Sequence, residues 1–179
     1  MAKIVNAVGG GDLHQELDLN ILHSVIDGEI ARYDPEHWPG LYLRLTPNSP
    51  AVLVFSSGKY NIAGATSIEH LLGSNGEFLS RLEEIEIVVA DPYFEVRNLV
   101  LLDDLGKELD LGQIAIALGL ESTEYEPEQF PGLLYRPNEL EGTFLIFRTG
   151  NILLTGLATR SEAEKAFDEL FEDLTTLLP

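Results

Sequence analysis

The sequence predicts an α+β fold made of two copies of one unit, in which helices pack on a mostly antiparallel sheet. Two observations support this prediction. Shifting the chain by 92 residues aligns its halves without a gap, and 20 of the 61 positions between residues 4 and 64 are then identical. Each half also shows the same order of short apolar strands and amphipathic helices. The pattern indicates a tandem duplication, with a first repeat over residues 1–89 and a second over residues 90–179.

The aligned positions are rich in residue types with special structural roles: asparagine, proline, glycine and aromatic residues. The clearest matches are Asn6 with Asn98, Val8 with Val100, residues 16–19 with 108–111, Pro39-Gly40-Leu41 with Pro131-Gly132-Leu133, Phe55 with Phe147, Gly58 with Gly150 and Gly64 with Gly156.

Each repeat is predicted to run strand, helix, four strands and helix. The first strands are expected at residues 4–8 and 98–102, and the first helices at about 17–26 and 109–118. Three of the following strands are placed at 41–45, 51–55 and 59–65, and in the second repeat at 133–136, 143–147 and 151–155. The closing helix of the second repeat, 161–177, carries an apolar stripe from Ala163 to Leu174. In the first repeat, Gly73-Ser74-Asn75-Gly76 interrupts the pattern and predicts a less regular helix.

Several strands are apolar on both faces, which an antiparallel sheet with helices on one side does not need. Residues 51–55, 144–147 and 152–154 are of this kind. Four helices can cover one face of about ten strands but not two. Either two sheets stack as a sandwich, or one face meets a large ligand or partner.

Composition narrows the function classes. The chain has 30 acidic and 11 basic residues, a net charge of −19, 45% hydrophobic residues and no cysteine. It is therefore predicted to fold, without disulfides, a zinc–thiolate site or a thiol nucleophile. No apolar run reaches the length of a membrane span, and the start lacks a signal-peptide pattern, so a soluble cytoplasmic protein is expected. Acidity normally argues against nucleic acid, but acid spread over the surface with only four lysines also fits a protein adapted to very salty cytoplasm.

The repeated motifs resemble the TATA-binding protein family, in its archaeal and halophilic form. They are Asn-x-Val, Tyr-x-Pro-Glu-x-aromatic-Pro-Gly-Leu, an apolar strand ending in Phe, and the two following glycines, in two copies over about residues 4–175. The resemblance implies a tandem-duplicated saddle, with a curved ten-stranded antiparallel sheet and four helices on the convex face. It also implies a general transcription initiation factor that binds and bends promoter TATA-box DNA through the minor groove, that is not an enzyme, and that needs no cofactor.

The resemblance assigns the base-reading residues to one pair in each repeat. Asn6 and Asn98 are expected to donate to the A N3 and T O2 acceptors, the only acceptors of an A·T pair in the minor groove. Val8 and Val100 lie two residues further on the same strand face, where they disfavour the amino group of guanine. The kinking aromatic pairs are Trp38 with Phe55 and Phe130 with Phe147.

Strand parity extends the predicted interface. If Phe55 faces the DNA, so do Ser57, Lys59, Asn61 and Ala63. In the second repeat Phe147 is followed in the same way by Thr149, Asn151, Leu153 and Thr155. Arg44 and Arg136 share the parity of Trp38 and Phe130, and the resemblance implies that they reach flanking phosphates.

Five positions depart from the family pattern and concern the strength of DNA binding. The family usually has Phe at Trp38, Val at Asn61, Thr at Ala63 and Lys at Asn151, and often a basic residue at His37. We therefore expect fewer contacts from basic side chains to phosphates than is usual in the family. For partners, Glu126 and Glu128 resemble the acidic loop that meets basic residues of transcription factor B, through which RNA polymerase is recruited indirectly.

Two other functions remain open from the residues alone. A duplicated small-molecule-binding domain would use the apolar sheet face as a pocket, and a hydrolase would hold a metal with carboxylates. Against them, His14, His23, His37 and His70 show no metal-ligand spacing, and a pocket does not need aromatic and asparagine residues repeated in symmetric pairs.

Overall fold

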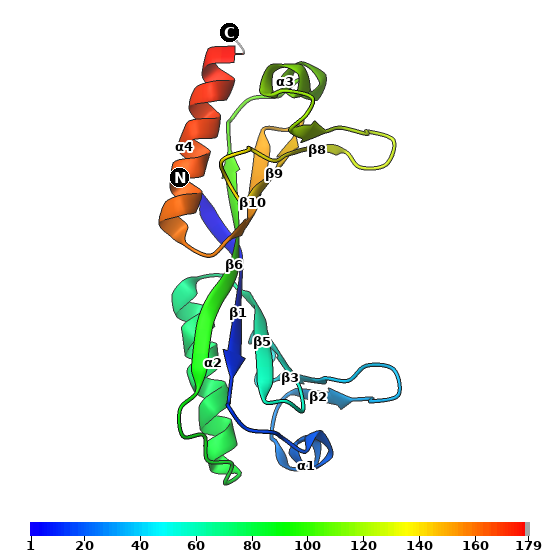
Figure 1. The fold of residues 1–179 in the computed structure, drawn as a ribbon, viewed down its shortest axis with the longest axis vertical. Helices are drawn as coiled ribbons and strands as arrows, with labels where there is room; N and C mark the ends of the chain where they lie inside the picture. Colours follow the sequence, from blue (N-terminus) through cyan, green and yellow to red (C-terminus); the bar gives the residue numbers. More distant parts are fainter. Residues whose placement is uncertain (178–179) are drawn as a thin grey trace. The chain divides into compact units, whose positions relative to one another are not determined.

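The first repeat of the computed structural model, which describes residues 1–177, contains five strands and two helices. Figure 1 shows them in blue to green, and their order matches the one predicted. They are β1 (Lys3–Asp12), α1 (Leu19–Val25), β2 (Ile30–Tyr33), β3 (Leu41–Arg44), β4 (Ala51–Val54), β5 (Lys59–Ala65) and α2 (Ile68–Glu84).

The second repeat contains the same elements in the same order. They are β6 (Tyr93–Asp104), α3 (Leu111–Leu118), β7 (Thr123–Glu124), β8 (Gly132–Tyr135), β9 (Thr143–Phe147), β10 (Asn151–Leu157) and α4 (Arg160–Leu177). The predicted α+β class, with ten antiparallel strands and four helices, is confirmed over residues 1–177. None of these helices is both long and apolar enough to span a bilayer.

All ten strands belong to one sheet, in the order β2-β3-β4-β5-β1-β6-β10-β9-β8-β7. The alternative of two stacked sheets is therefore wrong for the described residues. The chain divides into two compact units. The N-terminal unit is Asn6–Arg97, and the C-terminal unit is Met1–Val5 with Asn98–Pro179. The units thus differ from the predicted repeats only at the two long strands, β1 and β6, and the repeat boundary itself stays a prediction.

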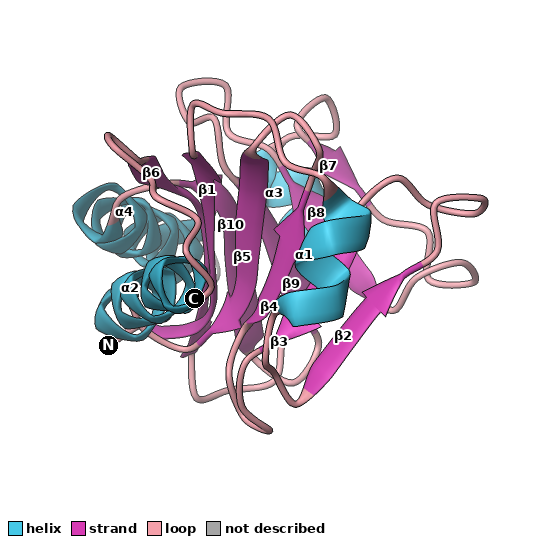
Figure 2. Cartoon of the chain, turned by 90° about the horizontal axis from the view of Figure 1, so that it is seen from below, coloured by secondary structure: helices cyan, strands magenta, loops and turns pink. Residues whose placement is uncertain are grey.

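Strand parity separates two faces of the sheet in the N-terminal unit. Val52, Val54 and Ile62 are buried, whereas their neighbours along the strands are partly or fully exposed. Helix α2 covers the buried face (Figure 2). The rings of Tyr60 and Phe78 pack there, with centroids 5.0 Å apart. The opposite side, which carries Phe55, is called the uncovered face below.

The C-terminal unit repeats this arrangement. Phe144, Ile146 and Ile152 are almost fully buried. Helix α4 covers them through Phe167, whose ring centroid is 5.6 Å from that of Phe144. The predicted apolar stripe of α4 supplies this contact, since Ala163, Ala166, Phe167, Leu170 and Leu174 are all buried. The uncovered face of this unit carries Phe147.

Helix α2 is continuous through the segment predicted to disturb it. It runs unbroken from Ile68 to Glu84. A β-carbon added at Gly73 or Gly76 would meet nothing within 4 Å, so both glycines face solvent. They lower helix propensity by about 1 kcal/mol each, and the burial of Leu71, Phe78 and Leu82 outweighs that cost.

The two short helices begin later than predicted because aspartates cap them. The Asp18 carboxylate accepts from the backbone N–H groups of Asn20 and Ile21 at 2.9 and 3.2 Å, and Asp110 accepts from Gln113 N–H at 3.1 Å. A capping residue is not helical itself. The helices therefore start at Leu19 and Leu111.

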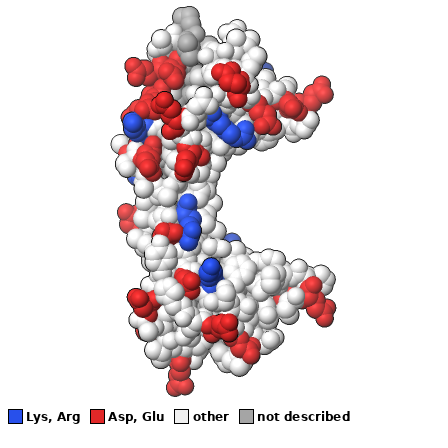
Figure 3. Space-filling model, viewed as in Figure 1, with Lys and Arg blue, Asp and Glu red and all other residues white. Residues whose placement is uncertain are grey.

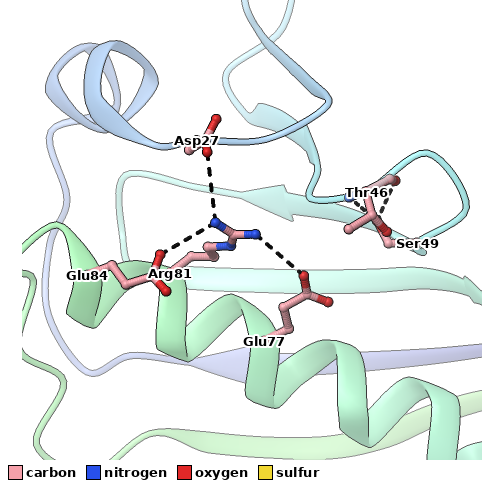
Figure 4. Close-up of polar contacts among 6 residues, drawn as sticks. All are labelled: Asp27, Thr46, Ser49, Glu77, Arg81 and Glu84. Atoms are coloured by element: carbon pink, nitrogen blue, oxygen red, sulfur yellow. Dashed lines mark hydrogen bonds and ion pairs between the residues drawn. The ribbon is translucent and has the colours of Figure 1, made fainter.

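One arginine connects α2 to the loop after α1 (Figure 4). Arg81 lies 3.9 Å from Asp27, 3.9 Å from Glu77 and 3.5 Å from Glu84. Asp27 is almost fully exposed, and exposed pairs of this kind contribute at most about 1 kcal/mol. The same figure shows the Thr46–Ser49 turn, which Ser49 Oγ closes by donating to Thr46 O at 3.0 Å.

Candidate nucleic-acid interface

A β-bulge holds Asn6 in the N-terminal unit. Ala7 pairs with Ala65 and Val8 pairs with Ala63, so Gly64 is an extra residue on β5. Gly64 has φ +101°, a left-handed conformation that glycine adopts without strain. The bulge takes the Gly64 N–H out of the sheet ladder, and Asn6 Oδ1 accepts it at 3.0 Å. The repeated Asn and Gly are therefore two halves of one structural motif.

The C-terminal unit contains the same motif with one additional contact. Leu154 pairs with Leu101 and Leu157 with Leu99, which places a bulge at residues 155–156. Gly156 has φ +98° and donates its N–H to Asn98 Oδ1 at 2.7 Å. Here the amide nitrogen of Asn98 also donates to the Thr155 hydroxyl at 3.1 Å. Asn6 has no such contact, because Ala63 occupies the position equivalent to Thr155.

The bulge determines which end of each asparagine is available. A backbone N–H needs an acceptor, so it selects the amide oxygen and turns the NH₂ group away from the bulge. Each side chain therefore presents a donor on the uncovered face. Val8 and Val100, two residues along the same strands, are partly exposed beside it. A donor next to an apolar side chain is the arrangement that favours A·T over G·C in the minor groove.

Two aromatic pairs lie further out on the uncovered faces. Trp38 and Phe55 have ring centroids 5.6 Å apart, and Phe130 and Phe147 are 5.9 Å apart, both in an edge-to-face arrangement at 66°. Trp38 is 39% exposed, which is high for a tryptophan. The structure thus brings together each pair that the sequence predicted.

Glycines make room for these rings. A β-carbon built on Gly40 would lie 2.3 Å from the Trp38 ring, and one on Gly132 would lie 2.7 Å from the Phe130 ring. Any larger residue at either position would displace an aromatic side chain. In the sequence, Pro-Gly-Leu is recognisable only as a repeated motif, and this role of the glycine was not predicted.

The remaining predicted side chains follow the expected strand parity. In the N-terminal unit Lys59 is exposed beside the buried Tyr60, and Ser57 is exposed in the preceding turn. In the C-terminal unit Leu153 and Thr155 are partly exposed, while Ile152 and Leu154 are buried. Thr149 is exposed in its turn. All of these residues lie on, or at the edge of, an uncovered face.

The two predicted arginines have different surroundings. Arg44 Nε donates to the Tyr42 hydroxyl at 2.9 Å, within the same strand. Arg136 lies 3.4 Å from the Glu124 carboxylate, and both side chains are more than half exposed. A phosphate would therefore have to compete with Glu124 for Arg136 but not with a carboxylate for Arg44. Figure 3 shows the wider setting, with acidic side chains outnumbering basic ones over both units.

The loop proposed for a protein partner is exposed. Glu126 and Glu128 are both exposed. The Glu126 carbonyl accepts from the N–H groups of Gln129 and Phe130, each at 2.9 Å. Because the turn is closed by backbone atoms, both carboxylates are free to vary without loss of the loop geometry.

The perturbed pKa values belong to tyrosines outside the asparagine motifs. Burial raises the pKa of Tyr60 to about 12, and its hydroxyl donates to Asn75 Oδ1 at 2.6 Å. Burial, followed by the charge of Asp173, raises the pKa of Tyr135. The hydrogen bond to Glu95 is the main cause that raises the pKa of Tyr93. These phenols stay neutral at physiological pH.

Two cavities are lined by residues other than the asparagines, valines and aromatic pairs described above. One of about 560 Å³ is lined by α4 and the segment after β8, including Tyr135, Leu140 and Glu169. Another of about 510 Å³ lies near Glu108 and Arg148. Neither cavity has the lining that the small-molecule alternative requires, which is the apolar sheet face around Phe55 or Phe147.

Comparison with known proteins gives consistent results along the chain. The family described as "Transcription factor TFIID (or TATA-binding protein, TBP)" matches twice, at residues 1–85 and 93–177. TATA-box-binding protein C of Halobacterium salinarum is 43% identical over 168 residues, covering 93% of each chain. The TATA-box-binding protein of Archaeoglobus fulgidus is 42% identical over 177 residues, covering 98% of this chain and 95% of the relative. A solved structure, Methanococcus jannaschii TBP, superimposes with a TM-score of 0.86 at 36% identity, covering 98% of both chains.

A duplicated α+β chain with these matches is a transcription initiation factor rather than an enzyme. The chain belongs to the TATA-binding protein family.

Proposed function

We propose that this protein binds double-stranded promoter DNA at an A·T-rich TATA element, from the minor-groove side, and bends it. The observation that carries the proposal is the bulge-held asparagine, present once in each unit. Gly64 and Gly156 each fix an amide oxygen, so that two NH₂ groups are directed to the uncovered faces. These donors match the A N3 and T O2 acceptors of A·T pairs.

The aromatic pairs support bending. Minor-groove architectural proteins, the TATA-binding protein family among them, insert apolar wedges between base steps. Phe55 and Phe147 are partly exposed at the ends of β4 and β9, each braced by a second ring at less than 6 Å. A braced ring keeps its orientation when a base step opens against it.

Phosphate contacts are assigned to Arg44, Lys59 and Arg136. These three cations stand in a chain of net charge −19, so ordinary counterion release contributes little to binding. Cations taken up between carboxylates and phosphates then favour association as salt rises. We therefore propose that the protein acts at high salt, in the cytoplasm at the nucleoid.

Partner recruitment is proposed through the loop that carries Glu126 and Glu128. Their exposure and charge suit basic residues of transcription factor B, which in turn brings RNA polymerase to the promoter.

The test is binding of a labelled TATA duplex, against a scrambled duplex of equal composition, in potassium chloride from about 0.1 M to about 2 M. We expect selective binding that strengthens with salt, with folding followed separately by circular dichroism. Equal affinity for both duplexes on folded protein would contradict the proposal. A slope of about −3 in log affinity against log salt would show that counterion release dominates and that the acidity has no role in binding.

A further inference from the structure

Three residues of the N-terminal unit form a polar group on its uncovered face. Gly10 of β1 and Asn61 of β5 are direct cross-strand partners. A β-carbon built on Gly10 would lie 2.9 Å from Arg97 Nε and 3.2 Å from Asn61 Oδ1. The Arg97 side chain from β6 and the Asn61 amide therefore both lie over the bare backbone of Gly10. Gly10, Asn61 and Arg97 are called the polar triad.

The neighbouring glycines show which face the polar triad occupies. A β-carbon on Gly9 would collide with the Phe94 ring at 2.2 Å, and one on Gly11 with the Tyr60 ring at 2.2 Å. Tyr60 lies on the face that α2 covers. Because successive residues of a strand point to opposite faces, Gly10 points to the uncovered face, like Asn6 and Val8.

The equivalent positions of the C-terminal unit are all apolar. Ninety-two residues along the chain, Gly10 corresponds to Leu102 and Asn61 to Leu153, while Arg97 corresponds to Val5. Leu102 and Leu153 are again direct cross-strand partners. Val5 is 36% exposed. Val5, Leu102 and Leu153 are called the apolar triad.

The two triads differ in what they offer to a base pair. In the minor groove a G·C pair differs from an A·T pair by one donor, the guanine amino group. Asn61 Oδ1 is an acceptor, and the Asn61 side chain is exposed. The apolar triad has no acceptor, so a guanine amino group buried against it would remain unpaired, which is costly.

We propose that the polar triad is a subsite for a G·C pair, and that the apolar triad excludes one. This inference rests on the proposed function and adds a preferred orientation to it. A TATA element with a G·C pair in one half then binds in one orientation only. The N-terminal unit takes the half of the element that contains G·C, and the C-terminal unit takes the half that is purely A·T.

Arg97 can contact the DNA because its ion pair is exposed. Its Nε lies 2.9 Å from Glu95 Oε1, but Arg97 is 59% and Glu95 41% exposed. Such a pair is weak, so the guanidinium can turn to the acceptors of the groove, whose negative potential attracts arginine. If Arg97 acted only on phosphate, its loss would weaken every duplex equally.

The experiment compares an A·T-only element with versions that carry one G·C pair at each position, using anisotropy in about 2 M potassium chloride. Orientation is read from a DNA-cleaving reagent tethered at Ser56→Cys, since the chain has no other cysteine. Outside the base pairs that Asn6, Val8, Asn98 and Val100 face, we expect a G·C pair in the half held by the C-terminal unit to weaken binding about tenfold or more. In the half held by the N-terminal unit it should weaken binding no more than about twofold. Cleavage should fall on the tolerant half.

Two sets of variants test the triads. Asn61→Leu with Arg97→Val gives the N-terminal unit two of the three side chains of the apolar triad. This variant should make G·C costly in both halves and cleavage equal at both ends. Leu153→Asn should make the intolerant half more tolerant. Arg160→Val is the matched control, because it also removes an arginine paired to a carboxylate. Arg160 Nε lies 2.8 Å from Glu164 Oε1 on α4. This variant should leave the affinities for all the duplexes unchanged.

Equal cost of G·C in both halves for the unmodified protein would overturn the inference. So would a uniform loss across all duplexes in the Asn61/Arg97 variant, which would identify a phosphate contact only. Failure to bind even the A·T-only element, by protein shown to be folded, would instead refute the proposed function itself.

Discussion

Replacing Asn6 by Asp tests the bulge-held amide directly. In the unmodified protein Gly64 N–H donates to Asn6 Oδ1 at 3.0 Å. Asp has the same shape as Asn, so its carboxylate retains an oxygen for this N–H. The other terminal atom changes from a donor to an acceptor. The substitution therefore keeps the structural half of the motif and inverts the half that faces the DNA.

The size of the effect follows from the contacts. One donor–acceptor hydrogen bond is lost, worth about 1 kcal/mol, and a desolvated carboxylate is left against base acceptors, at a cost of about 2 kcal/mol or more. Together these give about 3 kcal/mol, or about a 150-fold rise in Kd. Asn98→Asp should cost less, because the Thr155 hydroxyl, which already contacts the Asn98 amide, can donate to the new carboxylate.

The assay is fluorescence anisotropy with a TATA duplex at high salt, with thermal unfolding measured on the same samples. Asn6→Asp should leave the melting temperature nearly unchanged. Asn6→Leu removes the acceptor for Gly64 N–H as well, so it should lower the free energy of unfolding by about 1–3 kcal/mol. Asn20→Asp, which adds the same charge on the exposed surface of α1, should alter neither property.

The reasoning would be refuted if Asn6→Asp bound the duplex as tightly as the unmodified protein while Asn20→Asp did the same. It would also fail if Asn6→Asp destabilised the fold as much as Asn6→Leu, because the bulge would then not be held by the oxygen.

Three further predictions concern other parts of the molecule. Phe147→Ala should reduce the DNA bend, measured by end-to-end energy transfer at saturation, more than it lowers the melting temperature, because the ring is partly exposed on the uncovered face; an unchanged bend would contradict the wedge role. Glu126→Lys with Glu128→Lys should abolish the ternary complex with transcription factor B and leave DNA binding intact or stronger, since the turn is closed by backbone atoms; loss of both complexes would indicate misfolding instead. Burial on folding raises the pKa of Tyr60 from 10.0 to about 12. The resulting stabilisation is therefore complete below pH 10, and about 2–3 kcal/mol of the free energy of unfolding is lost as the pH rises to 12. Tyr60→Phe should flatten that decline in chemical denaturation measured at each pH, and an identical decline would show that other groups cause it.

The duplication, the element types and the face on which most site residues lie could be predicted from the sequence. The spacing of 92 residues and the alternation along β4, β5, β9 and β10 are local or repeated signals. They placed Phe55 and Lys59 on one face, and Phe147 and Leu153 on its counterpart, because side-chain direction in a strand depends only on parity. The continuity of α2 was underestimated, because glycine propensity was weighed without the burial of Leu71, Phe78 and Leu82. The starts of α1 and α3 were placed two residues early, because Asp18 and Asp110 are capping residues.

The choice between one sheet and two required the folded chain, because strand pairing brings together residues that are distant in sequence. β2 and β7 are short and partly exposed, so they carry little apolar periodicity and could not be placed from it. The capture of the Asn6 oxygen by Gly64, and the position of Arg97 over Gly10, depend on which strands pair and where a bulge shifts their register. Cross-strand pairing is a long-range contact that side-chain periodicity does not encode, and for this reason the orientation of the amide and the polar triad could be seen only in the folded chain.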